Sequence, residues 1–170
     1  MKKKSDVLVS VVMGSDSDLP VMSEATKILE EFGIPHELFL TSAHRTPART
    51  TKFAQEAAKC GIKIIIVGAG AAAHLAGVIA SQTQLPVIGV PIDATAVHGL
   101  DALLSTVQMP GGIPVATMAI GRAGAKNAAL YAARILALED KKISTKLSAY
   151  IKKMARDVEK KQENISCRKS

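Results

Sequence analysis

The chain contains no tryptophan, and only five of its 170 residues are phenylalanine or tyrosine. Proteins that bind single-stranded nucleic acid stack the bases on aromatic side chains, so this scarcity argues against RNA binding. The hydrophobic fraction of 48% is ample for a core, which must then consist mainly of aliphatic side chains. The length suits one domain, since domains commonly run to roughly 100–200 residues.

Cysteines and long apolar runs are also scarce. Cys60 and Cys167 are the only two cysteines, and they match no metal or redox spacing, which favours a reduced, cytoplasmic protein. No apolar run reaches the roughly 18 residues that would span a bilayer. Lys2, Lys3 and Lys4 are followed by a short apolar stretch without a small-residue cleavage site, so we expect neither a signal peptide nor a membrane partner.

The net charge of +7 lies in the C-terminal tail. Residues 1–140 hold 12 basic and 12 acidic residues, whereas residues 141–170 hold 10 and 3. Apolar residues recur in the tail at helical spacing: Ile143, Leu147, Ile151, Met154 and Val158. We predict an α/β domain over residues 1–140, which would carry any catalytic site, and a basic amphipathic helix and tail over residues 141–170. The helix, over 141–160, would pack on the domain or on another subunit; a solvated basic face, RNA binding and membrane binding are the alternatives.

Apolar, β-branched runs alternate with helical segments along the domain. The predicted strands are 7–13, 36–40, 62–67, 86–92 and 113–120. The predicted helices run from Ser17 or Asp18 to Gly33 and over 47–60, 74–82, 99–107 and 124–138. This alternation predicts a three-layer αβα domain with a doubly wound, five-stranded parallel sheet of the flavodoxin-like order 2-1-3-4-5. The loops 14–18, 41–47 and 68–74 follow the first three strands, so they should meet at one edge of the sheet, where ligands bind in such folds.

The loop over 41–47 carries the strongest chemical signal. His44 can exchange a proton near neutral pH, because the unperturbed pKa of histidine is ~6.5. Arg45 offers a forked donor to phosphate or carboxylate. We therefore predict proton transfer by His44 beside an anion held by Arg45.

The loop over 14–18 suggests a phosphoribosyl group. Ser15 and Ser17 place hydroxyl donors before a helix, where an anion is stabilised. Asp16 and Asp18 repel phosphate but suit sugar hydroxyls, and no P-loop motif is present, so the loop predicts a monophosphate-plus-ribose site. Plain helix capping by Ser17 or Asp18 is the alternative.

The loop over 68–74 has two interpretations. Gly68, Gly70 and Ala73 match the G-x-G-x-x-A pattern, and Asp93 ends the next strand, which leaves an NAD-dependent oxidoreductase open. The pattern follows the third strand rather than the first, and its small residues serve equally to let a backbone or ligand approach. His74 begins the next helix, whose dipole favours a neutral ring.

Metal and nucleophile chemistry find little support. His36, His44, His74 and His98 lack metal-ligand spacing, so no metal site is expected. Cys60 lies near a helix C-terminus, which disfavours a thiolate, and no G-x-S-x-G motif occurs.

Five ordered blocks together resemble the 5-(carboxyamino)imidazole ribonucleotide mutase family of de novo purine (IMP) synthesis, also described as the catalytic subunit of phosphoribosylaminoimidazole carboxylase. The resemblance covers about residues 7–140, and the blocks are 13–18, 42–47, 68–75, 108–115 and 127–130. It implies an isomerase that moves a carboxylate from the exocyclic nitrogen of the ribonucleotide to ring carbon four, by decarboxylation and recarboxylation. It further implies that no metal, biotin or nucleotide cofactor is needed, and that the protein is a homo-octamer.

The resemblance also implies roles for individual residues. His44 would be the acid/base. The phosphate would be held by Ser15, Ser17, Ser42 and Arg45, and the ribose by Asp18. The pocket for the base and carbon dioxide would be lined by Gly70, Ala71, His74 and Leu75.

A sister branch of the family carboxylates aminoimidazole ribonucleotide directly. It tends to carry Lys after the histidine, whereas Arg45 and Ala73-His74-Leu75 are similar to the mutase branch. Ala76 and Gly111 depart from the proline and the basic residue that many mutases have. Direct carboxylation and a non-catalytic nucleotide-binding module remain as alternatives.

Overall fold

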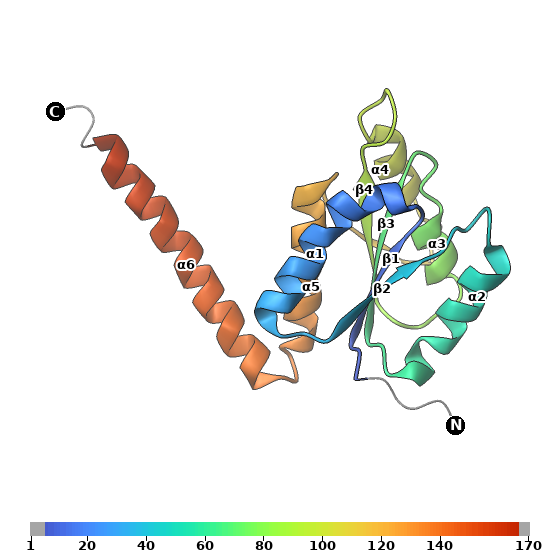
Figure 1. Cartoon of the computed structure of the whole chain (residues 1–170), viewed down its shortest axis with the longest axis horizontal. Coiled ribbons are helices and arrows are strands. Elements are labelled where there is room, and N and C mark those ends of the chain that lie inside the picture. Colours follow the sequence, from blue (N-terminus) through green and yellow to red (C-terminus); the bar gives the residue numbers. More distant parts are fainter. Residues whose placement is uncertain (1–5, 167–170) are drawn as a thin grey trace. The chain divides into compact units, whose positions relative to one another are not determined.

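The computed structural model describes residues 6–166 and contains a five-stranded, all-parallel sheet of order β2-β1-β3-β4-β5 (Figure 1). Each inner strand pairs in parallel with its neighbours. The predicted topology is therefore confirmed. The strands are β1 (Val9–Met13), β2 (His36–Leu40), β3 (Ile64–Gly70), β4 (Val87–Ile92) and β5 (Ala116–Thr117).

Helices cover both faces of the sheet. Glu24 on α1 pairs with Lys126 on α5 at 3.2 Å, which joins these two helices on one face. Hydrogen bonds from the ammonium groups of Lys27, which has the larger effect, and of Lys126 lower the pKa of the Glu24 carboxyl. The other face carries α2, α3 and α4. The helices are α1 (Leu19–Phe32), α2 (Pro47–Glu56), α3 (Leu75–Ala80), α4 (Leu100–Val107), α5 (Arg122–Leu136) and α6 (Lys141–Ser166), with 3-10 turns at Asp16–Asp18 and Ala58–Cys60.

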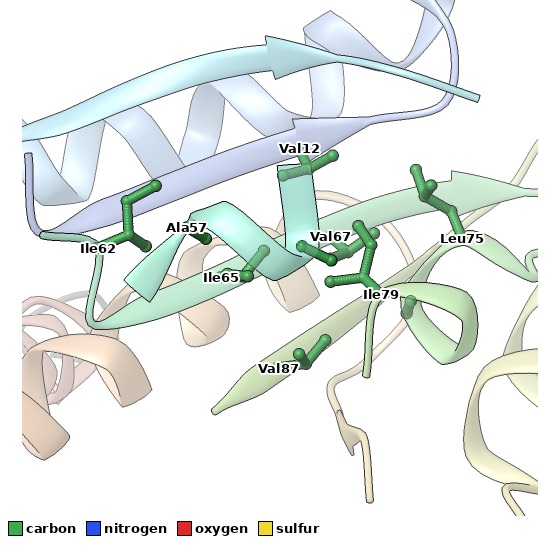
Figure 2. Close-up of a cluster of buried hydrophobic side chains, with 10 residues drawn as sticks. Val12, Ala57, Ile62, Ile65, Val67, Leu75, Ile79 and Val87 are labelled. Carbon is green, nitrogen blue, oxygen red and sulfur yellow. The ribbon is translucent and has the colours of Figure 1, made fainter. Parts of the chain in front are cut away.

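The three central strands are buried almost throughout. All of β1 and β4 is buried, as are the first five residues of β3. Burial on both faces explains why these strands read as unbroken apolar runs instead of alternating patterns. Figure 2 shows the cluster beneath α2 and α3, where Val12, Ile65 and Val67 from the sheet meet Ala57 and Ile79.

Several predicted boundaries are corrected. The fifth strand was expected over 113–120, but only Ala116–Thr117 pairs with β4. Pro114 has no N–H to donate and restricts the residue before it, which shortens this edge strand. The third strand begins at Ile64 and continues to Gly70, so Gly68, Ala69 and Gly70 belong to the sheet and not to the predicted loop.

The C-terminal helix predicted over 141–160 is present and extends to Ser166. Its first turns hold buried Ile143 and Leu147, while Ile151, Met154 and Val158 are exposed. The chain divides into two compact units, one ending at Ala132 and the other beginning at Ala133.

The basic N-terminal start and Cys167 lie outside the described residues. Within residues 6–166, none of the helices has the length and the apolar character that a membrane span requires.

Candidate active site

A hollow of about 360 Å³ lies in the first unit, where β1, β2 and β3 end. Every residue predicted for the site lines it, so the structure brings the three loops together as the topology requires. These residues are Ser15, Ser17, Asp18, Ser42, His44, Arg45, Gly70, Ala71, His74 and Leu75.

The first loop is a closed hydrogen-bonded turn. The Ser15 side chain accepts from the Ser17 N–H at 3.3 Å, and the Asp18 carboxylate accepts from the Ser15 N–H at 3.1 Å. This capping box starts the 3-10 turn, so the cap is Ser15 and not Ser17; Asp18 precedes α1 but makes no side-chain cap bond there. The Ser17 hydroxyl, which donates to Ser15 at 2.9 Å, stays at the hollow.

Asp18 is only 6% exposed, and desolvation by this burial raises the pKa of its carboxyl above the usual 3.8. Hydrogen bonds from the backbone of Ser15 and Gly14 oppose that rise, and the charge of Asp16 adds to it. A buried, incompletely solvated carboxylate is a strong hydrogen-bond acceptor, which suits the hydroxyl groups of a sugar.

Three threonines below the second loop fix its shape. Thr41 Oγ1 lies 2.9 Å from Thr50 Oγ1 and 3.1 Å from Thr46 Oγ1, and Thr46 Oγ1 also accepts from the Ser42 N–H at 3.0 Å. Pro47 then occupies the first helical position of α2, where its missing N–H costs nothing. The loop therefore presents His44 and Arg45 from a rigid base.

Arg45 joins the second loop to the first. Its Nη2 donates to the carbonyl oxygen of Gly14 at 3.1 Å, and its backbone N–H donates to Ser42 Oγ at 3.2 Å. The guanidinium thus stands beside Ser15, with donors left over for an anion.

His44 meets His74 across the hollow. The Nε2 of His44 lies 2.9 Å from the Nδ1 of His74, and the rings stand edge to face at an interplanar angle of 87°. One of these two nitrogens must carry a hydrogen and the other a lone pair, so the contact couples the tautomers of the two rings. Sequence reasoning placed both histidines near the site but did not predict their contact.

The third segment provides a small-residue wall. A Cβ on Gly70 would lie 2.6 Å from the Cβ of Ala94, so glycine is needed for this close approach. The chain then turns at Ala71, which has a φ of +53°. Since β3 runs through Gly70, both glycines of the predicted G-x-G-x-x-A pattern lie in the strand and only residues 71–74 form a loop after it, which argues against the dinucleotide-binding interpretation.

Ala94, in the loop after β4, also lines the hollow and was missed. Its position after the strand next to β3 was the available signal, but alanine carries no chemistry to draw attention to it. No cluster of three metal-ligating side chains occurs in the part of the chain that the structure describes.

Comparison with known proteins identifies the family of the chain. The model of the AIR carboxylase family matches residues 8–157. The N5-carboxyaminoimidazole ribonucleotide mutase of Pyrococcus horikoshii is 58% identical over 96% of this chain and 91% of its own, and that of Thermotoga maritima is 53% identical over 92% and 91%. The crystal structure of Treponema denticola PurE superposes with a TM-score of 0.84 at 30% identity, covering 92% of this chain and 97% of that one. The chain belongs to the AIR carboxylase family.

Proposed function

We propose that the protein is an N5-carboxyaminoimidazole ribonucleotide mutase of purine biosynthesis. It converts 5-(carboxyamino)imidazole ribonucleotide to 4-carboxy-5-aminoimidazole ribonucleotide. The observation that carries this proposal is the placement of His44 in one hollow with a cation, hydroxyl donors and a buried carboxylate. Mutases that are more than half identical over most of the chain support the same reaction.

His44 serves both proton transfers. The bond between the exocyclic nitrogen and the carboxylate breaks, its electron pair stays on nitrogen, and His44 donates the proton that nitrogen takes up. Carbon four of the resulting aminoimidazole then attacks the released carbon dioxide, and His44 removes the proton from that carbon. One group acts first as acid and then as base, so the reaction closes without a second base.

The remaining residues bind and enclose the reactants. Hydroxyl groups of Ser15, Ser17 and Ser42 and the guanidinium of Arg45 hold the phosphate, and Asp18 accepts from the ribose hydroxyls. The wall of Gly70, Ala71 and Leu75, with His74, keeps carbon dioxide beside its acceptor. Such confinement replaces a bimolecular encounter with a neighbouring-group reaction. The hydrogen bond between His44 and His74 also orients the His44 ring.

The test uses His44→Asn, which keeps a hydrogen-bonding group at this position but cannot shuttle a proton. Turnover of the N-carboxylated substrate, followed by ultraviolet absorbance of the product, should fall by about 10²- to 10⁴-fold. Product affinity, measured by calorimetry, should change little. A wild-type protein that binds the ribonucleotide without turnover would be a binding module, and turnover only of aminoimidazole ribonucleotide with bicarbonate would indicate direct carboxylation.

We also propose that the enzyme is a cytoplasmic homo-octamer. Leu100, Leu104 and Val107 form an apolar stripe on α4 and are 53%, 48% and 48% exposed in the single chain. A contiguous apolar stripe of this kind is typical of a protein-protein interface. The lack of disulfide-type cysteine spacing supports a reducing compartment.

A further inference from the structure

A second hollow, of about 340 Å³, adjoins the first. The two share Gly14, Ser15, Ser42 and Arg45, so a ligand in one can extend into the other. Arg49, which no step of the proposed reaction uses, lines only the second hollow.

Arg45 lies in the loop before α2 and Arg49 in the first turn of that helix, and both side chains line the second hollow. Its Cζ lies 4.9 Å from the centroid of the Phe39 ring, which in turn stacks on Phe53 at 4.4 Å. The aromatic ring holds the face of the guanidinium and leaves the N–H donors at its edge available. Among residues 6–166, no carboxylate lies within ion-pair distance of Arg49.

The charges differ between the two hollows. The first contains one guanidinium, Arg45, and the buried carboxylate of Asp18. The second contains Arg45 and Arg49 against one carboxylate, Asp16. That carboxylate is already engaged, because its Oδ1 accepts from the Ser15 hydroxyl and from the Ser17 N–H, each at 3.1 Å. A phosphate dianion is therefore favoured in the second hollow and repelled by Asp18 in the first.

We propose that Arg49 is a further substrate-binding residue and that the phosphate of the substrate occupies the second hollow, between Arg45 and Arg49. The ribose, base and carbon dioxide then occupy the first hollow. Ser17 borders only the first hollow, so its hydroxyl reaches the phosphate from the ribose side, where the two hollows join. This assignment rests on the proposed function, because it takes a phosphoribosyl compound as the ligand. Two guanidinium groups, one from the loop before α2 and one from its first turn, can each donate to the phosphate, which makes the binding geometrically specific.

The test compares two ligands that differ only in the phosphate. Calorimetry measures the Kd of 4-carboxy-5-aminoimidazole ribonucleotide and of the corresponding ribonucleoside for wild type, Arg49→Met and Arg49→Lys. Removing a hydrogen bond to a charged group costs about 1.5–3 kcal/mol, so Arg49→Met should weaken ribonucleotide binding about 10- to 100-fold. Binding of the ribonucleoside should not change. Arg49→Lys should recover part of the loss, because it keeps the charge without the fork.

Lys52→Met is the matched control, since Lys52 is an exposed cation on the same helix that lines neither hollow. It should leave both Kd values unchanged. Equal losses for ribonucleotide and ribonucleoside in Arg49→Met would overturn the proposal, because Arg49 would then act on the loop and not on phosphate. Unchanged binding of both ligands would overturn it as well.

Binding of ribose 5-phosphate, measured beside mutase activity, distinguishes failure of this inference from failure of the proposed function. If wild type turns over neither carboxylation substrate but still binds ribose 5-phosphate in an Arg49-dependent way, the mutase activity fails and the phosphate subsite stands. If wild type is an active mutase and ribose 5-phosphate binds equally well to Arg49→Met, the subsite fails and the activity stands.

Discussion

Asp18 is a buried carboxylate that lines the candidate active site, and its burial lowers the stability of the protein when no ligand is bound. Burial raises its pKa, so the native state holds the proton more tightly than the unfolded chain does. The protonated Asp18 carboxyl makes its full favourable contribution to the free energy of unfolding below the usual pKa of 3.8. This contribution is lost as the pH rises through the raised pKa. At neutral pH the ionised group therefore lowers the free energy of unfolding.

Asp18→Asn removes this charge and should raise the free energy of unfolding at pH 7. The difference from wild type should shrink as the pH falls through the raised pKa and vanish below 3.8, which urea denaturation at pH 7 and just below pH 3.8 measures. Affinity for the ribonucleotide should fall about 10-fold or more, since a charged acceptor for the ribose hydroxyls is lost. A variant less stable than wild type at pH 7 would mean that the hydrogen bond from Ser15 outweighs the cost of burial.

Single residues were predictable where their chemistry stands out within one loop. His44 and Arg45, or Ser15 and Asp18, are informative side chains close together in the sequence. The hydrogen bond between His44 and His74 joins residues 30 positions apart, and it forms only because the shapes of two loops bring the rings together. Arg49 was not predicted for a different reason: one arginine on an ordinary helix carries no signal until the hollow and the Phe39 ring are located.

At the scale of elements, α5 starts in close contact with the segment after β5. A Cβ on Gly124 would overlap the backbone carbonyl of Ala119, and backbone cannot move aside as a flexible side chain can. Gly124→Ala should therefore destabilise the protein by about 3 kcal/mol, at the upper end of the usual cost of overpacking. Chemical denaturation measures this difference.

Gly111→Ala is the control, because no atom lies within 4 Å of a Cβ at that position. Its effect should stay within about 0.5 kcal/mol, as for most surface substitutions. Equal stability of the two variants would show that the start of α5 shifts freely and that the close contact is not a constraint.

Strands with unbroken β-branched runs were predicted well, because burial on both faces leaves a clear pattern. The range predicted for β4, which is buried throughout, starts only one residue early. The range predicted for β2, 36–40, also agrees with the structure, although this edge strand is only partly buried and has no β-branched residue. The errors lie where backbone chemistry competes with hydrophobicity. Pro114 shortens β5, and the small residues Gly68 to Gly70, which resemble a loop in sequence, extend β3 because β4 pairs with them.

At the scale of the whole molecule, the topology explains how residues from three separate loops come together in one site. The order β2-β1-β3 places three consecutive strand ends side by side, so one hollow gathers His44 from one loop, Asp18 from another and small apolar residues from a third. The alternation of strands and helices predicted this arrangement, since the handedness of the crossovers leaves few topologies to consider.

Assembly is the remaining property at this scale, and the exposed stripe on α4 makes it testable. Wild type should have a mass of roughly 143 kDa by light scattering, eight copies of the 17.9 kDa chain, if the octamer is correct. Leu104→Glu places a charge in the middle of the stripe and should reduce the mass to that of a smaller species. In an isolated chain the same change would be nearly neutral, because Leu104 is half exposed.

Gln55→Glu adds the same charge to an exposed position on α2 and should leave the mass unaltered. If Leu104→Glu lowers the mass but circular dichroism shows an intact fold, the stripe is an interface between copies. Position 104 is half exposed in the single chain, so the new charge can be buried only where another copy covers it. A wild-type mass of 17.9 kDa would contradict the octamer and leave the stripe without a partner in the homo-oligomer. A full-sized assembly of Leu104→Glu would place the contacts between copies on other surfaces.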